Sequence, residues 1–370
     1  MKNWYEVNNV AELDSPSLLL YKERVASNID KMIAIAGGTS RLAVHVKTNK
    51  MPEVVKMMLA KGITKFKCAT IAEAEMAAMA GAKFIIIAHQ LVGPKINRLI
   101  QLHQKYQDVM FASLIDCEEI LQETNQKFAD KGLIATVLVD VNNGMNRSGY
   151  DLDEHLEDFC LKINSQSNLQ FLGLHAYDGH LRDADFGTRK AKIEEGFKYV
   201  SEVFNKLQTQ ITHTIYLVSG GTPAFTSHAT ENERLCSPGT CVLWDWGYGD
   251  VLQEQPFDYA ALILTRVISK PAKGLISIDM GHKAVASENP INKRIRFLNL
   301  ADYELLSQSE EHGVLRVENW ENIKVGDVLY GVPYHICPTI NLYDEVNVIE
   351  QNQATTHWQI LGRKRRITTI

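Results

Sequence analysis

The stretch KFKCATIAEAEMAAMAGAKFIIIA, residues 65–88, contains a complete strand–helix–strand unit. Two short β-rich runs, at residues 65–69 and 83–88, flank an alanine-rich stretch of helical character. The residues from Thr70 to Glu73 have the spacing of a capping box that begins a helix, and Gly81 is placed to end it. A strand, a helix and a second strand in this order are typical of a parallel α/β fold.

The same unit recurs along the first 245 residues. Amphipathic stretches of helical period separate most of the β-rich runs, which lie at 42–47, 65–69, 83–88, 109–114, 133–140, 169–176, 214–219 and 241–245. Eight such units over about 200 residues predict a (β/α)8 barrel. An open doubly wound sheet is the alternative. No GxGxxG follows the first strand, so a dinucleotide-binding fold has no support.

After residue 246 the pattern changes to short β-rich runs separated by glycine, proline and asparagine. Such runs predict a smaller, mostly antiparallel β domain. A chain of 370 residues suits one large and one smaller domain. We therefore expect a (β/α)8 barrel over residues 18–245 and a β domain over residues 246–370, to which residues 1–17 are added.

Composition excludes some classes of protein. The formal net charge of −5 gives no reason to expect nucleic acid as a partner. The N-terminal residues lack the apolar core of a signal peptide, and no apolar run approaches the roughly 20 residues that cross a bilayer. We expect a cytoplasmic protein that binds no membrane, with its six cysteines reduced.

Two basic residues follow predicted barrel strands, at the end where such barrels carry their chemistry. Lys47 follows the largely apolar run at 42–46. A partly desolvated ammonium loses its proton more readily and can attack an aldehyde, although a strand that surfaces with its lysine in water is the simpler alternative. Arg147 lies in the Asn- and Gly-rich stretch 140–150, where it can donate to a phenolate or carboxylate or remain solvated.

Two glycine-containing turns, VSGGTPAF at 218–225 and SPGT at 237–240, offer a phosphate site. In the first turn Ser219, Gly220, Gly221 and Thr222 offer unhindered backbone N–H groups and two hydroxyls that can cradle a phosphate, and Gly239 and Thr240 form a second turn of this kind. The first turn follows the seventh predicted strand, a favoured position for phosphate in these barrels. The second precedes the run at 241–245 that we expect to be the eighth strand.

Three further residues have a chemical and a structural interpretation. Tyr177, at the end of the run 169–176, can stack on or hydrogen-bond to an aromatic cofactor, or simply pack. His335 and Cys337 lie two apart, which on a strand would place both on one face. Imidazole and thiolate suit zinc or a manganese-type ion and would leave positions for water or substrate, whereas the alternative is a buried cysteine beside a packed histidine.

Taken in order, the blocks HVKT, GMNRSG, HAYDGH, SGGTP, SPGT and HICPT resemble the fold-type III pyridoxal-phosphate enzymes, the alanine racemase fold. Within that group the chain is most similar to the branch of D-threonine aldolase and eukaryotic-type D-serine dehydratase. The resemblance extends from about Leu18 to about Arg363.

The resemblance implies roles for these residues. Lys47 would carry pyridoxal 5'-phosphate as a Schiff base, Arg147 would face its phenolic oxygen, and Tyr177 would lie near its pyridine ring. The phosphate would be held by Ser219, Gly221 and Thr222, with Gly239 and Thr240 contributing. His335 and Cys337 would bind the divalent metal, zinc or manganese, that is characteristic of this branch.

The sequence departs from the family pattern at two positions. Family members often have histidine where Asn49 stands. Racemases of this fold usually have an arginine, which pairs with the pyridine nitrogen, where Ser237 stands. The missing arginine and the expected metal pair both favour chemistry on a β-hydroxyl group over racemisation.

The implied activity is that of a metal-assisted lyase on D-β-hydroxy amino acids, most like D-threonine aldolase, which would release glycine and an aldehyde. A D-serine or D-threonine dehydratase is the first alternative and an amino acid racemase the second. A cofactor-binding protein without turnover is a further alternative, but the small carriers of this fold lack the β domain. The resemblance also implies a homodimer in which the β domain of one subunit closes the barrel mouth of the other.

Overall fold

The computed structural model describes residues 3–368 and 370. Its contacts divide the chain into two compact units, each built from two segments. The first, called the barrel unit here, comprises Met32–Gly239 and Leu361–Ile370. The second, called the β unit, comprises Met1–Lys31 and Thr240–Ile360. Among the described residues, no helix is both long and apolar enough to cross a membrane.

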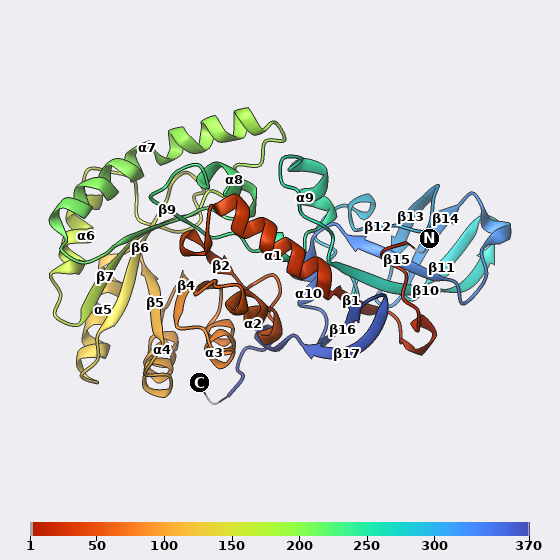
Figure 1. Cartoon of the computed structure of the whole chain (residues 1–370), viewed down its shortest axis with the longest axis horizontal. Coiled ribbons are helices and arrows are strands. Elements are labelled where there is room, and N and C mark those ends of the chain that lie inside the picture. Colours follow the sequence, from red (N-terminus) through yellow and green to blue (C-terminus); the bar gives the residue numbers. More distant parts are fainter. Residues whose placement is uncertain (1–2, 369) are drawn as a thin grey trace. The chain divides into compact units, whose positions relative to one another are not determined.

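The barrel unit contains an eight-stranded parallel sheet whose strands follow one another in chain order (Figure 1). The strands are β2 (Ala43–His45), β3 (Lys65–Cys68), β4 (Phe84–Gln90), β5 (Met110–Ile115), β6 (Ala135–Val141), β7 (Leu169–Ala176), β8 (Tyr216–Ser219) and β9 (Arg234–Cys236). A parallel bridge between Leu42 and Cys236 joins the first strand to the last, so the sheet is nearly closed. The expected (β/α)8 barrel is confirmed, and an open doubly wound sheet is excluded.

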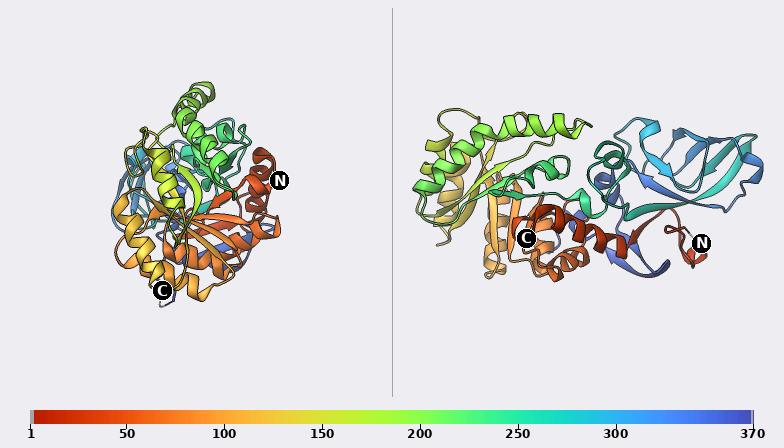
Figure 2. Two further views of the ribbon diagram at one scale, coloured as in Figure 1. Left: turned by 90° about the vertical axis from the view of Figure 1, so that its left-hand side faces the viewer. Right: turned by 45° about the horizontal axis from the view of Figure 1, so that its top comes forward.

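Helices alternate with these strands and lie outside the sheet, as Figures 1 and 2 show. They are α2 (Pro52–Ala60), α3 (Ile71–Met79), α4 (Pro94–Lys105), α5 (Glu118–Ala129), α6 (Leu156–Asn164), α7 (Phe186–Gln210) and the short α8 (Phe225–His228). Helix α3 begins as predicted, because the Thr70 side chain accepts the Glu73 N–H at 3.1 Å. Gly81, at φ +104°, follows it in the left-handed conformation that glycine tolerates.

The eighth strand is not where the sequence indicated. Residues 241–245 do not form a strand, since Thr240–Val242 is a 3-10 turn and β9 completes the sheet instead. The run was misassigned because a short buried apolar segment has the same hydrophobic pattern whether it is a strand or a turn. The SPGT turn therefore follows the last strand, so both glycine-containing turns come after neighbouring strands, β8 and β9.

The barrel interior is packed with apolar side chains. Its core cluster consists of Ala43, Ile86, Ala112, Leu114, Leu138, Leu172, Val218 and Leu235. These residues alternate along the strands with residues that face the helices, as expected when both faces of a parallel sheet are covered.

The β unit is a nine-stranded, mostly antiparallel sheet, drawn mainly in cyan to blue in Figure 1, as the sequence predicted. Its strands are β1 (Ser17–Tyr21), β10 (Ala261–Ala272), β11 (Leu275–Ile278), β12 (Ile295–Phe297), β13 (Tyr303–Gln308), β14 (Gly313–Val317), β15 (Val328–Pro333), β16 (Glu345–Glu350) and β17 (Gln353–Gln359). Strand β1 pairs antiparallel with β10 and parallel with β16. The unit also contains α9 (Trp246–Val251) and α10 (Ile336–Ile340), while the division at residue 31 falls inside α1 (Lys22–Ala36).

Candidate active site

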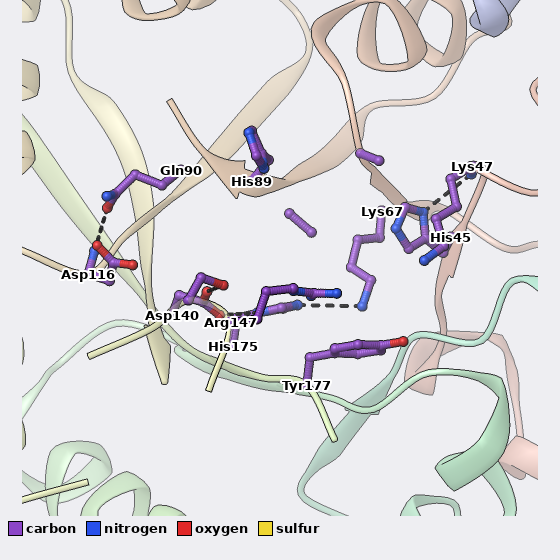
Figure 3. Close-up of a pocket in the computed structure, with 13 residues that line it drawn as sticks. His45, Lys47, Lys67, His89, Gln90, Asp116, Asp140, Arg147, His175 and Tyr177 are labelled. Carbon is purple, nitrogen blue, oxygen red and sulfur yellow. Dashed lines mark hydrogen bonds and ion pairs between the residues drawn. The ribbon is translucent and has the colours of Figure 1, made fainter. Parts of the chain in front are cut away.

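A pocket of about 470 Å³ opens in the barrel unit where several strands end (Figure 3). Three residues singled out from the sequence line it: Lys47, Arg147 and Tyr177. The pocket also contains polar side chains that the sequence did not single out, namely His45, Lys67, His89, Gln90, Asp116, Asp140, Ser148 and His175. The structure thus brings the predicted residues together and surrounds them with further titratable groups.

Lys47 is held in a turn that follows β2. Its backbone N–H donates to Nδ1 of His45 at 3.3 Å, and its side chain is half-buried. The turn continues to Lys50, which has a positive φ of 55° and donates its N–H to the carbonyl of Val46. Lys47 therefore neither surfaces into water nor joins the core, but lies at the pocket wall.

The ring of Tyr177 forms one side of the pocket, and two glycines make room for it. A Cβ on Gly179 would lie 2.1 Å from the Tyr177 hydroxyl oxygen, and one on Gly221 would lie 2.8 Å from its Cε2. Side chains at these two positions would displace the ring. The glycines of the HAYDGH and SGGTP blocks are therefore required for the position of Tyr177.

Three cationic side chains gather around this ring. Nζ of Lys47 lies 5.9 Å from the ring centroid, Nζ of Lys67 lies 5.7 Å from it, and Cζ of Arg147 lies 5.1 Å from it. Figure 3 shows all three pointing towards one space above the ring. Three positive charges so close together favour an anionic ligand in that space.

Lys67 is the functional candidate that sequence reasoning missed. It lies in β3 with only 2% of its surface exposed. Its ammonium group donates to Oγ of Ser237, to the carbonyl of Gly220 at 3.3 Å, and towards Nε2 of His175 at 3.5 Å. Burial, followed by the positive charge of Lys47, lowers the pKa of Lys67 to about 7. Lys67 is therefore the buried cation at the base of the pocket.

A carboxylate and an imidazole support Lys67 from the neighbouring strands. Nδ1 of His175 lies 2.7 Å from Oδ1 of Asp140, whose Oδ2 accepts a hydrogen bond from Ser148 Oγ at 3.0 Å. Burial lowers the pKa of His175, so its ring is neutral at pH 7. Because Nδ1–H donates to the carboxylate, Nε2 is left to accept from Lys67.

We expect Lys67→Met to raise the free energy of unfolding of the cofactor-free protein by roughly 1–4 kcal/mol at about pH 7, because it removes a desolvated charge. The unfolded chain keeps the Lys67 proton up to its ordinary pKa of 10.5, whereas the folded protein loses it near pH 7. Between these values the unfolded state binds more protons, so wild-type stability rises with pH. The advantage of the variant is therefore full at and below about pH 7 and shrinks towards about pH 10.

Urea unfolding followed by far-ultraviolet circular dichroism, at both pH values, would check this expectation. Tryptophan fluorescence would report on the β unit and not on the barrel unit that contains Lys67, because all five tryptophans lie in the β unit. Lys56→Met is the matched control, since Lys56 is an exposed lysine on α2 of the same unit. A large loss of stability in Lys67→Met would contradict this expectation. It would mean that the hydrogen bonds of Lys67 stabilise the protein by more than the desolvation of its ammonium costs.

The two glycine-containing turns contact each other. The Gly239 N–H donates to Oγ1 of Thr222 at 3.2 Å, and Ser237 Oγ donates to the Gly220 carbonyl at 2.7 Å. Ser219 ends β8 and is buried. The barrel unit thus brings together four of the five predicted phosphate-binding residues, Ser219, Gly221, Thr222 and Gly239.

A buried polar network underlies the first of these turns. Gly220 has a φ of +65°, and a Cβ there would lie 2.4 Å from Cδ2 of His228. Both nitrogens of the His228 ring have partners. Nε2 lies 2.7 Å from Oδ2 of Asp178, and Nδ1 lies 3.1 Å from Nη1 of Arg234. This network fixes His228 directly beneath Gly220, so only glycine fits there.

The fifth residue, Thr240, lies in the β unit beside the predicted metal pair. Its Oγ1 is 3.5 Å from Sγ of Cys337. His335 and Cys337 do not lie on a strand, as the sequence suggested, because His335 precedes α10 and Cys337 lies in its first turn. Their side chains nevertheless hydrogen-bond to each other.

Two acidic residues of the β unit surround this pair. Nδ1 of His335 lies 2.7 Å from Oε1 of Glu288, and buried Asp245 accepts the Ile336 N–H at 3.0 Å. Burial opposes the charged imidazole, but the hydrogen bond that the ring donates to Cys337 and the nearby negative charges raise the pKa of His335 to about 9. Burial raises the pKa of Asp245 to about 6, against the N–H donors of Tyr248 and Ile336.

Within residues 3–368 and 370, no group of three or more His, Cys, Asp or Glu side chains is arranged to hold a metal ion. A metal on His335 and Cys337 would therefore need water or substrate to complete its coordination. All six cysteines, each of which the structure describes, are free, as expected for a chain with reduced thiols.

Comparison with known proteins identifies two matching family models and several related proteins. The model of the alanine racemase N-terminal domain matches residues 21–245, and that of a serine dehydratase domain matches residues 260–349. The chain is 27% identical to a 3-hydroxy-D-aspartate aldolase of Paracoccus denitrificans strain Pd 1222, over 95% of this chain and 93% of that protein. It is also 27% identical to a D-threonine aldolase of an Arthrobacter species, over 96% of this chain and 94% of that one.

Solved structures show the same fold. A D-threonine aldolase from Filomicrobium marinum superposes with a TM-score of 0.87 at 22% identity, over 98% of this chain and 99% of that chain. A D-threo-3-hydroxyaspartate dehydratase, in a metal-free cysteine-to-alanine variant, gives 0.80 at 19% identity, over 95% and 98% of the two chains. Because the first family model spans well over half of the chain, the protein belongs to the alanine racemase N-terminal domain family and, within it, to the pyridoxal-phosphate enzymes of the D-threonine aldolase and D-serine dehydratase branch.

Proposed function

We propose that this protein is a lyase that uses pyridoxal phosphate and a divalent metal to cleave D-β-hydroxy amino acids to glycine and an aldehyde. The observation that carries the proposal is the convergence of Lys47, Lys67 and Arg147 above the ring of Tyr177. Similarity to two aldolases over 95% and 96% of the chain supports cleavage as the reaction.

The residues of the pocket fit pyridoxal phosphate. Lys47 offers an amine for its aldehyde, Arg147 a donor for its phenolic oxygen, and Tyr177 an aromatic face. The phosphate would be held by Ser219, Gly221, Thr222 and Gly239, with Thr240 contributing. When bound, this cofactor delocalises negative charge that develops on the substrate carbon next to the amino group.

The chain's own residues would bind and orient the substrate. Lys47 would hold the cofactor through its amine and would be placed to hold or move a proton beside the substrate Cα. The positive charges of Lys67 and Arg147 attract the carboxylate of an amino acid into the pocket.

The metal of this proposal would be held by His335 and Cys337. Zinc or manganese suits an imidazole and a thiolate, and would supply Lewis acidity to a substrate hydroxyl. Glu288, on Nδ1 of His335, would orient the ring so that Nε2 is the atom offered to the ion. The mutual hydrogen bond of His335 and Cys337 supports the pair as joint ligands, because it places their side chains together.

A dehydratase is the second candidate, and one specific observation favours it. The variants of D-threo-3-hydroxyaspartate dehydratase with solved structures replace a histidine and, two positions later, a cysteine, and the cysteine variant is metal-free. His335 and Cys337 have the same order and spacing. In a dehydratase Lys47 would accept the Cα proton and the β-hydroxyl would leave, whereas in an aldolase a base takes the hydroxyl proton.

Product analysis would test both candidates. The protein is incubated with pyridoxal phosphate and Mn²⁺ or Zn²⁺, with an EDTA control, and given D-threonine or D-threo-3-hydroxyaspartate. We expect glycine with acetaldehyde from the first substrate and glycine with glyoxylate from the second. 2-Oxobutanoate or oxaloacetate, each with ammonia, would identify a dehydratase instead.

Two other outcomes would overturn the lyase proposal. Formation of L-allothreonine alone would indicate a racemase that acts at Cα. Tightly bound cofactor without turnover of any D-hydroxy amino acid would indicate a carrier. The proposed enzyme is a homodimer, which sedimentation equilibrium would check.

A further inference from the structure

Within the described part of the chain, the ammonium group of Lys67 forms no ion pair, although the charges of Asp140 and Asp178 act on it from a distance. Its three hydrogen-bond partners are the hydroxyl of Ser237, the carbonyl of Gly220 and the neutral imidazole of His175. Among the residues that the structure describes, no carboxylate forms an ion pair with it. A buried cation without such a partner is costly, so a pocket that retains one has a use for its charge.

The direction of Lys67 follows from the barrel geometry. In the register of β2 and β3, Lys67 pairs with His45, which also lines the pocket. Because its ammonium donates to Ser237 Oγ, it lies where the end of a longer side chain at position 237 would be. The racemase pattern has an arginine at position 237, where this chain has a serine. The ammonium of Lys67, which comes from β3, takes the place of that missing positive charge.

The shape of pyridoxal phosphate indicates which of its atoms Lys67 faces. The phenolic oxygen and the phosphate-bearing arm flank the aldehyde carbon, and the ring nitrogen lies across the ring from that carbon. Lys47, Arg147 and the glycine-containing turns account for the first three groups. The ring nitrogen is the remaining polar atom, and Lys67 is the remaining cation within 6 Å of the Tyr177 centroid.

We propose that Lys67, held by Ser237 and the Gly220 carbonyl, donates a hydrogen bond to the ring nitrogen of the cofactor and keeps that nitrogen unprotonated. The inference rests on the proposed function, because it requires pyridoxal phosphate in this pocket. The contact towards His175 is the longest of the three, at 3.5 Å, so that hydrogen can turn to the nitrogen without loss of the bonds to Ser237 and Gly220. An unprotonated nitrogen withdraws less charge from the substrate carbon, which disfavours racemisation and suits a lyase whose hydroxyl is activated by a metal.

The test follows the nitrogen itself. The protein is reconstituted with pyridoxal phosphate labelled with ¹⁵N in the ring, and the ¹⁵N resonance is followed as the pH is lowered. In the wild-type protein we expect the resonance to stay at the unprotonated position. In Lys67→Met we expect it to move towards the protonated position, with a midpoint higher by about one pH unit or more, because a nearby positive charge has been removed.

Controls separate the possible causes. Lys65→Met should titrate as the wild type does, because Lys65 lies on the same strand outside the pocket. Lys67→Gln provides a second neutral variant, and Lys67→Arg should restore the wild-type titration. A titration indifferent to residue 67, or a change confined to the ³¹P resonance, would overturn the inference, the latter by assigning Lys67 to the phosphate.

The two proposals fail differently. If reduction with borohydride attaches no cofactor to Lys47 of the wild-type protein, the proposed function is wrong. If the cofactor attaches and the ring nitrogen is protonated in the wild-type protein, only the assignment of Lys67 is wrong.

Discussion

Replacing Lys47 by alanine will abolish covalent attachment of pyridoxal phosphate and lower kcat/KM by about 10³-fold or more. Lys47 is the half-buried lysine that the turn after β2 presents to the pocket. The pocket holds one further lysine, Lys67, whose ammonium is engaged with Ser237, Gly220 and His175 and is not positioned to replace it.

Visible absorbance of the attached cofactor, and mass spectrometry of the borohydride-reduced peptides, would measure this loss. Lys56→Ala is the matched control, because Lys56 is exposed on α2. An unchanged absorbance in Lys47→Ala would contradict the assignment. Transfer of the reduced adduct to the peptide that contains Lys67 would instead exchange the roles of the two lysines.

Removing the proposed metal is the second change with a large expected effect. EDTA treatment, His335→Ala or Cys337→Ala should each lower kcat/KM by about 10²- to 10⁴-fold. The reason is that a Lewis acid stabilises the transition state by several kcal/mol. Two protein ligands hold an ion less firmly than three or four, so loss of either should release it. Metal content by elemental analysis should fall together with activity.

Two comparisons make this result specific. Mn²⁺ or Zn²⁺ should restore activity to the EDTA-treated wild type but not to the variants. His357→Ala should behave as the wild type, because His357 is an exposed histidine of the same unit, on β17. Full activity in metal-free protein would contradict this prediction and would mean that His335 and Cys337 have a structural role only.

Much of the fold followed from local patterns. Strand, capping box and glycine stop in residues 65–88 predicted the unit that the structure repeats around the barrel. The position of Lys47, Arg147 and Tyr177 in one pocket followed from the sequence, because each comes after a recognisable strand and the ends of parallel strands meet at one rim. The glycines of both turns were found because glycine marks close approach of the backbone.

Other features depended on pairing partners far along the chain. Strand β1 joins β10 and β16, residues more than 200 positions away, and nothing in its own sequence specifies that choice. Residues 241–245 have the apolar character of a strand, but Leu42 pairs with Cys236 and leaves them no place in the sheet. His335 and Cys337 meet at the start of a short helix because Asp245 accepts the N–H of Ile336 between them.

The sequence by itself determined the alternation of strands and helices, the two-part organisation of the chain and the residues at the barrel rim, because these are properties of short segments. Only the tertiary structure decided where Lys67 lies. The run KFKC predicts a strand, and alternation alone does not say which face of that strand is buried. Closure of the barrel places Lys67 inside it, and Ser237, Gly220 and His175 from three distant segments then supply the hydrogen bonds that let a lysine remain buried beneath the pocket.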